Sequence, residues 1–350
     1  MSKVKDQKVT DDYAIYNSDC MYVIPTLEDK SIDFSVYSPP FAGLYNYSSS
    51  ENDFSNCDTK DQFLQQYNFL IKEIARVTKP GRLTAVHCQD VLTDVTNNYL
   101  WDFPHYIIKM HEEAGFKFVN RITVWKEPLK VRLRTMAKSL THKTIVEDST
   151  KAFPAQPDYI LIFKRAGENE VPVTHTKGLN VYPYFGANPI QPETYRSLKG
   201  LPVTIEAIGT DIDDYNKAWD NILKKYENWK GDHKANKASH IMWRKYASSV
   251  WEDIRNEVVL PFKDSKEEDD EKHVHALQLD VIDRLVVLYT NPSEVVLTPF
   301  MGVGSEVYSP VSLGRKAIGI ELKESYYKQA VKNMNEAKQR FANMKPLTLF

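Results

Sequence analysis

Residues 295–304 read VVLTPFMGVG, an apolar run that ends in a glycine-rich turn. A stretch of helical composition follows from residue 305 to 313, and a second apolar run, AIGI at 317–320, closes on Glu321. This pattern predicts a strand, a glycine loop, a helix, a second strand and a strand-end acid within about thirty residues. Open α/β sheets bind an adenosine with such a unit, because glycines let the backbone approach the ligand and the acid accepts hydrogen bonds from the ribose hydroxyls.

The number of glycines in this loop narrows the choice of ligand. Gly302 and Gly304 precede the helix, and no third glycine follows at the spacing used for dinucleotides. A cradle for a pyrophosphate is therefore poorly supported. An adenosine cofactor without phosphates fits the pattern better.

A second apolar run, DFSVY at residues 33–37, stops abruptly at Ser38-Pro39-Pro40-Phe41. Two consecutive prolines fix φ and remove two N–H donors, so the carbonyls around Ser38 and Pro39 can face a ligand instead of joining a regular ladder. A planar amine lying on Phe41 can donate to a backbone carbonyl and to the Ser38 hydroxyl. The motif therefore predicts the active-site floor of an enzyme that acts on the exocyclic amine of a base. A strand followed by an ordinary proline turn is the alternative.

Together the two segments resemble the DNA amino-methyltransferases, which use S-adenosylmethionine to methylate adenine N6 or cytosine N4. Ser38-Pro39-Pro40-Phe41 matches the catalytic tetrapeptide of that family, and FMGVG at 300–304 matches its cofactor loop. The catalytic motif comes first and the cofactor motif last, as in the beta-type arrangement. The resemblance covers about residues 12–165 and 240–335. It implies an α/β fold, a doubly wound Rossmann-like methyltransferase sheet with an inserted target-recognition region.

The resemblance also extends to the flanking segments. Residues 17–20 (NSDC) resemble the segment that contacts the cofactor's adenine, and residues 272–279 (KHVHALQL) resemble the helix start that helps to hold its methionine end. The family usually has an acid at the position of Thr298, so the anchoring of the methionine end is left open here and we expect weaker affinity. The cofactor-binding residues implied are Asp19, Cys20, His275, Leu277, Thr298, Pro299, Phe300, Gly302, Gly304, Glu321 and Leu322.

The expected chemistry is an in-line methyl transfer from a sulfonium, which mainly requires positioning. The Ser38 hydroxyl oxygen and the Pro39 carbonyl would accept the hydrogens of the amine and favour a localised lone pair on nitrogen, so no general base of shifted pKa is required. The target base must leave the duplex, and Phe41 is the surface on which it would land. The resemblance implies that serine in the first position is more common among cytosine-N4 enzymes, so cytosine is favoured and adenine N6 is the alternative.

Composition bounds the remaining possibilities. With 350 residues, 42% of them hydrophobic, the chain can bury one large α/β core and carry a recognition region as well. It lacks a run of about twenty apolar residues and a signal peptide, so we expect no membrane partner and a cytoplasmic location in a bacterial or phage-infected cell. Cys20, Cys57 and Cys88 lack metal-ligand spacing, and no metal is expected. His87-Cys88 invites a metal or nucleophile interpretation, but a place at the mouth of a strand is favoured.

Basic residues gather between the two chemical motifs, although the chain has 45 basic and 47 acidic residues in total. Such clusters can face phosphates, although solvated helix faces produce similar runs. We expect double-stranded DNA as the partner, a cognate restriction enzyme as a second one, and a monomer or homodimer. RNA as the substrate and a non-catalytic binding module are the alternatives. The residues selected for nucleic-acid binding are Arg132, Arg134, Lys138, Lys143, Arg244 and Lys245.

The order of apolar patterns predicts the organisation of the chain. Residues 1–166 would form the catalytic part, 167–250 the target-recognition insert and 251–350 the cofactor-binding part. Strand and helix patterns alternate until residue 165, as a doubly wound sheet requires. Strands are expected at 13–17, 32–37, 82–88, 118–125 and 159–164, the last two as an antiparallel pair at the sheet edge, and helices at 60–77, 106–114 and around 214–229.

Overall fold

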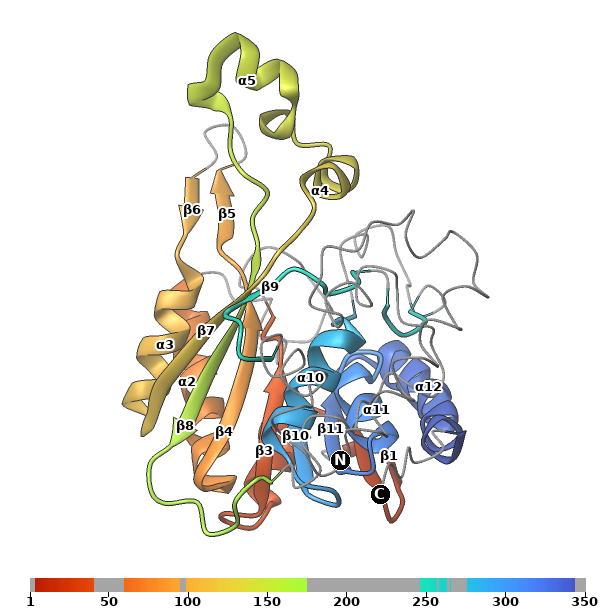
Figure 1. Cartoon of the computed structure of the whole chain (residues 1–350). Helices are drawn as coiled ribbons and strands as arrows, with labels where there is room; N and C mark the ends of the chain where they lie inside the picture. Colours follow the sequence, from red (N-terminus) through yellow and green to blue (C-terminus); the bar gives the residue numbers. More distant parts are fainter. Residues whose placement is uncertain are drawn as a thin grey trace, which may run out of the picture.

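The computed structural model describes residues 4–40, 60–94, 99–174, 246–256, 258–262, 265 and 276–343. Its main feature is a nine-stranded sheet flanked by helices (Figure 1). A small second sheet pairs β5 (Val91–Asp94) with β6 (Tyr99–Trp101). The strands of the main sheet, in spatial order, are β1 (Val4–Val9), β2 (Tyr13–Ser18), β11 (Lys316–Glu321), β10 (Val295–Thr298), β3 (Ile32–Tyr37), β4 (Thr78–Cys88), β8 (Asp158–Arg165), β7 (Phe116–Val124) and β9 (Val250–Trp251).

The centre of this sheet is parallel, and helices cover both of its faces. Strands β2, β11, β10, β3 and β4 run in the same direction, whereas β8 is antiparallel to β4 and β7. All six residues of β3 are buried, as expected for a parallel strand between two helical layers. The doubly wound Rossmann-like α/β fold is therefore confirmed. The helices are α1 (Cys20–Val23), α2 (Lys60–Val77), α3 (Phe103–Glu113), α4 (Pro128–Thr135), α5 (His142–Asp148), α10 (Leu279–Tyr289), α11 (Ser305–Ser312) and α12 (Glu324–Asn343), with short 3-10 turns η1 (Ile24–Thr26), η3 (Lys138–Leu140) and η4 (Ser149–Lys151).

Alternate side chains of the strands enter different core clusters. On one face, Tyr37, Val86 and Leu161 pack with residues of α2 and α3. On the other face, Phe34 and Val36 pack against α10. The clusters that include α11 and α12 continue this second layer over β2 and β11. The period-two pattern of the strands thus decides which helix each residue meets.

Most of the expected elements are present, with shifted ends. The helix at 60–77 has the expected bounds, whereas α3 begins at Phe103 because the Asp102 side chain accepts a hydrogen bond from the His105 amide and caps it. Strand β4 begins at Thr78, four residues before the expected start at Arg82. The pair at 118–125 and 159–164 is antiparallel, although two-residue β9 lies outside it at the edge. The helix expected around 214–229 lies outside the described residues.

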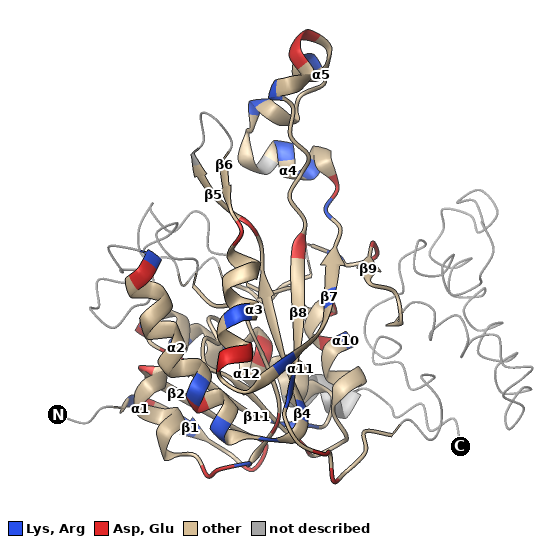
Figure 2. Cartoon of the chain, turned by 90° about the vertical axis from the view of Figure 1, so that its left-hand side faces the viewer, with Lys and Arg blue, Asp and Glu red and all other residues tan. Residues whose placement is uncertain are grey.

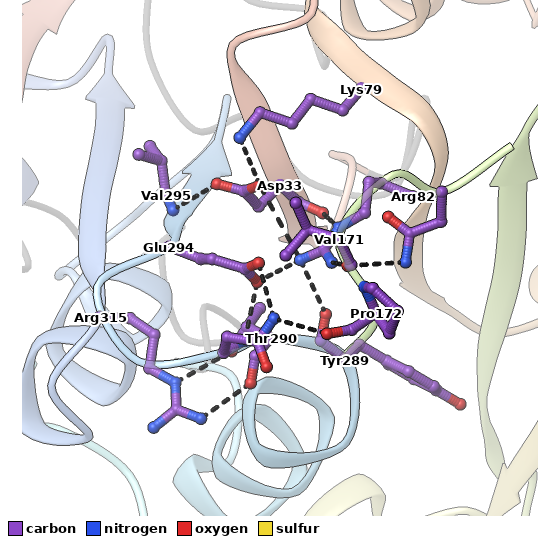
Figure 3. A network of polar contacts seen from close by, with 12 residues as sticks. Asp33, Lys79, Arg82, Val171, Pro172, Tyr289, Thr290, Glu294, Val295 and Arg315 are labelled. Carbon is purple, nitrogen blue, oxygen red and sulfur yellow. Dashed lines mark hydrogen bonds and ion pairs between the residues drawn. The ribbon is translucent and has the colours of Figure 1, made fainter. Parts of the chain in front are cut away.

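A polar network joins the amino ends of the central strands (Figure 3). Asp33 Oδ1 lies 2.6 Å from Lys79 Nζ, and Asp33 Oδ2 accepts a hydrogen bond of 2.9 Å from the Val295 amide. Arg82 forms an ion pair with Glu294 and donates to the Val171 carbonyl at 3.3 Å. These contacts fix β3, β4 and β10 relative to one another at the edge opposite the candidate site.

The connection between β7 and β8 projects beyond the carboxyl end of the sheet as a helical arm, residues 126–157 (Figures 1 and 2). It contains α4, η3, α5 and η4, and Figure 2 shows that α4 and α5 carry several basic residues. The sequence pattern did not predict these helices, because neither buries any apolar side chain that would give a periodic signal. Among the described residues, no helix is long and apolar enough to cross a membrane.

Candidate active site

The candidate residues converge at the carboxyl edge of the parallel strands. Strand β3 continues to α2 and β4 on one side, whereas β10 continues to α11 and β11 on the other. The chain direction across the sheet therefore reverses between β3 and β10, which pair directly. Ligands of open α/β sheets bind in the crevice at such a switch point. This topology brings together the ends of two segments that are more than 250 residues apart in the sequence.

The candidate catalytic tetrapeptide, residues 38–41, begins immediately after β3. Pro39 is buried, while Ser38 and Pro40 are partly buried, and Phe41 lies outside the described residues. Ser38 Oγ is 3.3 Å from Nδ1 of His87, which belongs to the neighbouring strand β4. The Ser38 hydroxyl therefore has a protein partner already in place.

His87 in turn contacts Asp158, the first residue of β8. His87 Nε2 lies 3.2 Å from Asp158 Oδ2, although the two atoms are not aligned as a regular hydrogen bond. Lys126 Nζ lies 2.5 Å from the other oxygen of the same carboxylate. Burial by itself raises the pKa of the Asp158 carboxyl, but the adjacent His87 and Lys126 outweigh it and hold that pKa well below its usual range. Asp158 is therefore a buried carboxylate that stays ionised.

A second buried polar chain lies beneath the catalytic strand end. The Tyr37 hydroxyl is 3.2 Å from His111 Nε2 and receives a 3.3 Å hydrogen bond from the Tyr67 hydroxyl. His111 Nδ1 lies 2.7 Å from the Ile107 carbonyl, so this nitrogen carries the proton and Nε2 accepts from Tyr37. Burial lowers the pKa of His111 to about 4, so its ring is neutral at pH 7. This chain fixes Tyr37, the residue before Ser38.

The glycine loop follows β10 as expected. Gly302 has φ +51° and no heavy atom within 4 Å of the position of an added Cβ, so its backbone borders open space. Gly304 has φ +96°, and an added Cβ would lie 3.1 Å from the Ala330 Cβ. The first glycine thus leaves room for a ligand, whereas the second allows α11 and α12 to pack closely.

Glu321, at the end of β11, is held against this loop. Its Oε2 accepts a 2.9 Å hydrogen bond from the Gly302 amide, and its Oε1 accepts one of 2.8 Å from the Lys323 amide. These two amides orient the carboxylate beside the glycine loop. Asn17, at the end of β2, donates to the carbonyls of Glu321 and Leu322 at 2.9 and 3.1 Å and joins the two strand ends.

The remaining cofactor candidates occupy different environments. Asp19 is partly buried and caps α1 through a 2.8 Å bond from the Met21 amide, and burial raises its pKa. Cys20 and Leu277 are buried, the latter in the cluster that includes α10. Thr298 is fully buried, and its hydroxyl has no hydrogen-bond partner in the described part of the chain. His275 lies outside the described residues.

The residue that precedes the candidate tetrapeptide contacts the candidate cofactor loop. The ring of Phe300, in the cofactor loop, meets that of Tyr37 edge to face with centroids 6.1 Å apart. Pro299 is buried next to Phe300. The structure thus places the ends of β3 and β10, which precede the two candidate segments, side by side at the carboxyl edge of the sheet.

The nucleic-acid candidates lie on the arm where they are described. Lys138 and Lys143 are exposed, Arg132 is partly exposed, and the Arg134 side chain is not described. Arg244 and Lys245 lie outside the described residues. Lys126 belongs to the same basic stretch of sequence, but it is turned inward to Asp158 and does not face solvent.

Sequence reasoning missed the three residues behind Ser38. His87 was assigned only to the mouth of a strand, and it is the last residue but one of β4, but its ring also faces Ser38. Asp158 and Lys126 carried no signal, because they approach His87 only through the antiparallel pairing of β4 with β8. The only available clue was Asp158, a charged residue directly before the apolar run at 159–164.

A glycine loop, an oriented strand-end acid and Ser-Pro-Pro across one switch point define a class I-like methyltransferase site. The family described as DNA methylase, of the N6/N4 type, matches residues 32–332. The chain belongs to this family of S-adenosylmethionine-dependent DNA amino-methyltransferases, which act on cytosine N4 or adenine N6. The expected family, enzyme class and cofactor are thereby confirmed. The site fits that cofactor, because open space faces the Gly302 backbone and Glu321 is oriented beside it.

Individual relatives agree with the family. The type II methyltransferase M.BglII of Bacillus subtilis is 23% identical over 339 residues, covering 95% of this chain and 72% of the relative. M.BamHI of Bacillus amyloliquefaciens, also a type II methyltransferase, is 24% identical over 349 residues, covering 97% of this chain but only 62% of the relative. Both relatives are thus longer than this chain.

Solved structures show the shared fold. TTHA0409 of Thermus thermophilus, described as a DNA modification methylase and solved with S-adenosylmethionine, has a TM-score of 0.54 at 17% identity, covering 91% of this chain and 93% of that one. The cytosine-N4-specific PvuII DNA methyltransferase has a TM-score of 0.52 at 12% identity, covering 97% and 95%.

Proposed function

We propose that the enzyme transfers a methyl group to the exocyclic amine of a base flipped out of duplex DNA, with cytosine N4 as the favoured target. The observation that carries this proposal is the contact between Tyr37, the residue before Ser38, and Phe300, the first residue of the proposed cofactor loop. A base that reaches Ser38 therefore also reaches the ligand of that loop. Pro39 follows Ser38 at the same strand end.

The proposed site residues form two groups, one that binds S-adenosylmethionine and one that binds the target base. When bound, S-adenosylmethionine supplies a methyl group made electrophilic by its sulfonium. Gly302 admits the ligand to the backbone, and Glu321 accepts the ribose hydroxyls. The residues proposed around them are Asp19, Cys20, His275, Leu277, Thr298, Pro299, Phe300, Gly304 and Leu322.

The Ser38 hydroxyl oxygen and the Pro39 carbonyl accept the two hydrogens of the target amine. Holding both hydrogens in fixed directions localises the nitrogen lone pair and aligns it for in-line attack. Pro40 keeps the turn rigid, and Phe41 stacks on the base. A duplex hides this amine, so the base must be flipped, at a cost of a few kcal/mol that protein contacts offset.

The DNA contacts are assigned to the arm and to the segment between β8 and β9. The arm, whose sequence includes Arg132, Arg134, Lys138 and Lys143, extends beyond the carboxyl edge of the sheet (Figure 2). Ser38 follows the carboxyl end of β3 at the same edge. The described chain leaves the core at the amino edge, where the Thr174 amide donates to Asn291 at 3.1 Å. It returns at the opposite edge, where Val250 pairs with Thr123. Arg244 and Lys245 belong to the stretch of sequence between these two points, and we assign residues 167–250 to a recognition insert between a catalytic part (1–166) and a cofactor-binding part (251–350).

The relatives indicate a biological setting for this enzyme. The M.BglII and M.BamHI relatives are named type II methyltransferases, so we assign this enzyme to a restriction-modification pair with a cognate restriction enzyme. Cellular DNA of a bacterial or phage-infected cell places it in the cytoplasm. It would act there as a monomer or homodimer.

The test is methylation of unmethylated duplex DNA with labelled cofactor, followed by nucleoside mass spectrometry. Detection of N4-methylcytosine supports the proposal, whereas detection of N6-methyladenine shows that adenine is the target base. A methylated base on RNA alone contradicts the proposal and favours an RNA methyltransferase. No methylated base, together with no cofactor binding, contradicts it and favours a non-catalytic binding module. Ser38→Ala is expected to lose activity while still binding cofactor. Ser31→Ala, before β3 at the amino edge of the sheet, serves as the matched control.

A further inference from the structure

Behind the catalytic hydroxyl lies a chain of three ionisable side chains that the methyl-transfer scheme does not use. Ser38 Oγ, His87, Asp158 and Lys126 follow one another with separations of 3.3, 3.2 and 2.5 Å. They come from the ends of β3, β4 and β8 and from the start of the arm. We propose that His87 is a positioning residue that orients the Ser38 hydroxyl and receives the proton released by the methylated amine.

The orientation argument starts from Asp158. This carboxylate is held ionised by Lys126, so it favours the ring form in which His87 Nε2 carries a hydrogen. Nδ1 then has a lone pair, and the Ser38 hydroxyl donates its hydrogen to it. Both lone pairs of Ser38 Oγ are left for the substrate amine. Without His87 the hydroxyl is free to rotate and to point its hydrogen at that amine, which is the wrong direction.

The same arrangement accounts for the proton. In the transfer step the carbon–sulfur bond of the sulfonium breaks and a carbon–nitrogen bond forms, leaving a positive charge and an extra hydrogen on the base nitrogen. That hydrogen passes to Ser38 Oγ while the original hydroxyl hydrogen passes to His87 Nδ1. Ser38 ends neutral, the ring becomes an imidazolium opposite Asp158, and the methylated amine is neutral. This is the logic of serine–histidine–aspartate sites, with serine as a relay and not a nucleophile.

The environment suits a proton carrier. The side chains of Asp158, Lys126 and His87 are 6%, 10% and 13% exposed, so the carboxylate is shielded while the ring retains a path to water. Other charged groups at this end of β4 are Arg121, Asp90 and Asp102, which act on the adjoining Cys88. A purely structural ion pair between Asp158 and Lys126 does not require His87 to face Ser38. In this structure the His87 ring lies between Asp158 and Ser38, as a relay requires.

The experiment measures single-turnover methyl transfer by His87→Asn across pH. Asparagine retains a polar atom near the position of Nδ1 but cannot take up a proton. We expect a rate loss of about 100-fold, within the range of general acid–base catalysis, with cofactor affinity unchanged. We also expect the wild-type rate to fall at acid pH, where a protonated ring cannot accept, and the variant to lose this limb. His105→Asn, an exposed histidine on α3, is the matched control.

The outcomes separate this inference from the proposed function on which it rests. A wild-type enzyme that methylates no base rejects the proposed function itself. A wild-type enzyme that methylates, together with a His87→Asn variant that keeps its rate within twofold and its acid limb, rejects the relay alone. If His87→Asn does not fold, the double variant Asp158→Asn/Lys126→Met, which retains His87 but not its ion pair, is compared instead. It should show a reduced rate and a shifted acid limb, and an unchanged profile overturns the relay.

Discussion

The rings of Tyr37 and Phe300 meet edge to face with their centroids 6.1 Å apart, although 262 residues separate them in the sequence. Tyr37 precedes Ser38, the proposed catalytic serine, and Phe300 begins the proposed cofactor loop. Their contact is therefore the point at which the two half-sites are set relative to each other. Tyr37 is itself fixed by hydrogen bonds to Tyr67 and His111.

Replacing Phe300 by leucine should weaken this alignment. An edge-to-face aromatic pair contributes about 1 kcal/mol beyond its buried area, so we expect cofactor affinity to fall about fivefold and the transfer rate to fall as well. Calorimetry and single-turnover kinetics measure the two effects. Phe69→Leu, on the exposed surface of α2, should change neither. Equal behaviour of the two variants would show that the ring contact has no role.

Glu321→Gln should reduce cofactor binding by about 100-fold, because hydrogen bonds to a charged group contribute about 1.5–3 kcal/mol. Glutamine keeps one acceptor oxygen for the backbone amides but loses the charge and the second oxygen. The thermal midpoint should change little, and calorimetric titration with S-adenosylmethionine gives the affinity. Glu324→Gln makes the same chemical change on exposed α12, where Glu324 pairs with Lys328. Wild-type affinity in Glu321→Gln would remove the ribose assignment.

The two loop glycines should respond differently to alanine. Gly302→Ala places its Cβ in open space at a φ that costs about 1 kcal/mol, so the protein should fold but bind cofactor poorly. Gly304→Ala brings its Cβ against Ala330 and should lower the free energy of unfolding by about 2 kcal/mol or more. Urea titration and calorimetry on both variants separate stability from binding. The reverse pattern would contradict the division of roles.

Glu306 gives a prediction about pH. Burial raises the pKa of this carboxyl from 4.5 to about 8, with a further rise from nearby Glu321. The unfolded chain ionises first, so the favourable contribution of the neutral acid is complete below pH 4.5 and is lost as pH rises towards 8. Glu306→Gln stays neutral, so its gain in unfolding free energy over wild type should grow from near zero at pH 4 to a few kcal/mol at pH 9. A constant difference from pH 4 to 9, measured by urea titration, would mean that folding does not change the pKa of Glu306.

The arm should carry a salt-dependent part of DNA affinity. Each phosphate contact contributes about 0.9 to the slope of log affinity against log salt, so Lys138→Ala/Lys143→Ala should reduce that slope by up to about 2. Fluorescence anisotropy with a duplex over a series of salt concentrations measures it. Lys164→Ala, at the amino edge of the sheet, should leave the slope unchanged. An unaltered slope in the arm variant would place the phosphates elsewhere.

The segments around Gly302 and Ser38 could be predicted from the sequence alone. Both motifs depend on residues adjacent in the chain, because a glycine turn or a proline pair imposes its conformation locally. The helix at 60–77 was predictable for a similar reason, since its buried residues repeat at helical spacing. The arm helices have no such repeat, and the ends of α3 and β4 depended on a cap and on Gly81, which packs against residues 168 and 169.

By itself, the sequence determined the class of chemistry: a strand-end Ser-Pro-Pro, a glycine loop and an acid, in an order that names the family. Only the tertiary structure decided what stands behind the serine. His87 meets Ser38 because β4 lies beside β3, and it meets Asp158 because β8 runs antiparallel to β4 and begins where β4 ends. Lys126 likewise appears as one of many basic residues until folding turns it inward. A short segment of sequence determines the local conformation of the chain. Contacts between distant strands depend instead on the order of strands in the sheet, which no single segment specifies.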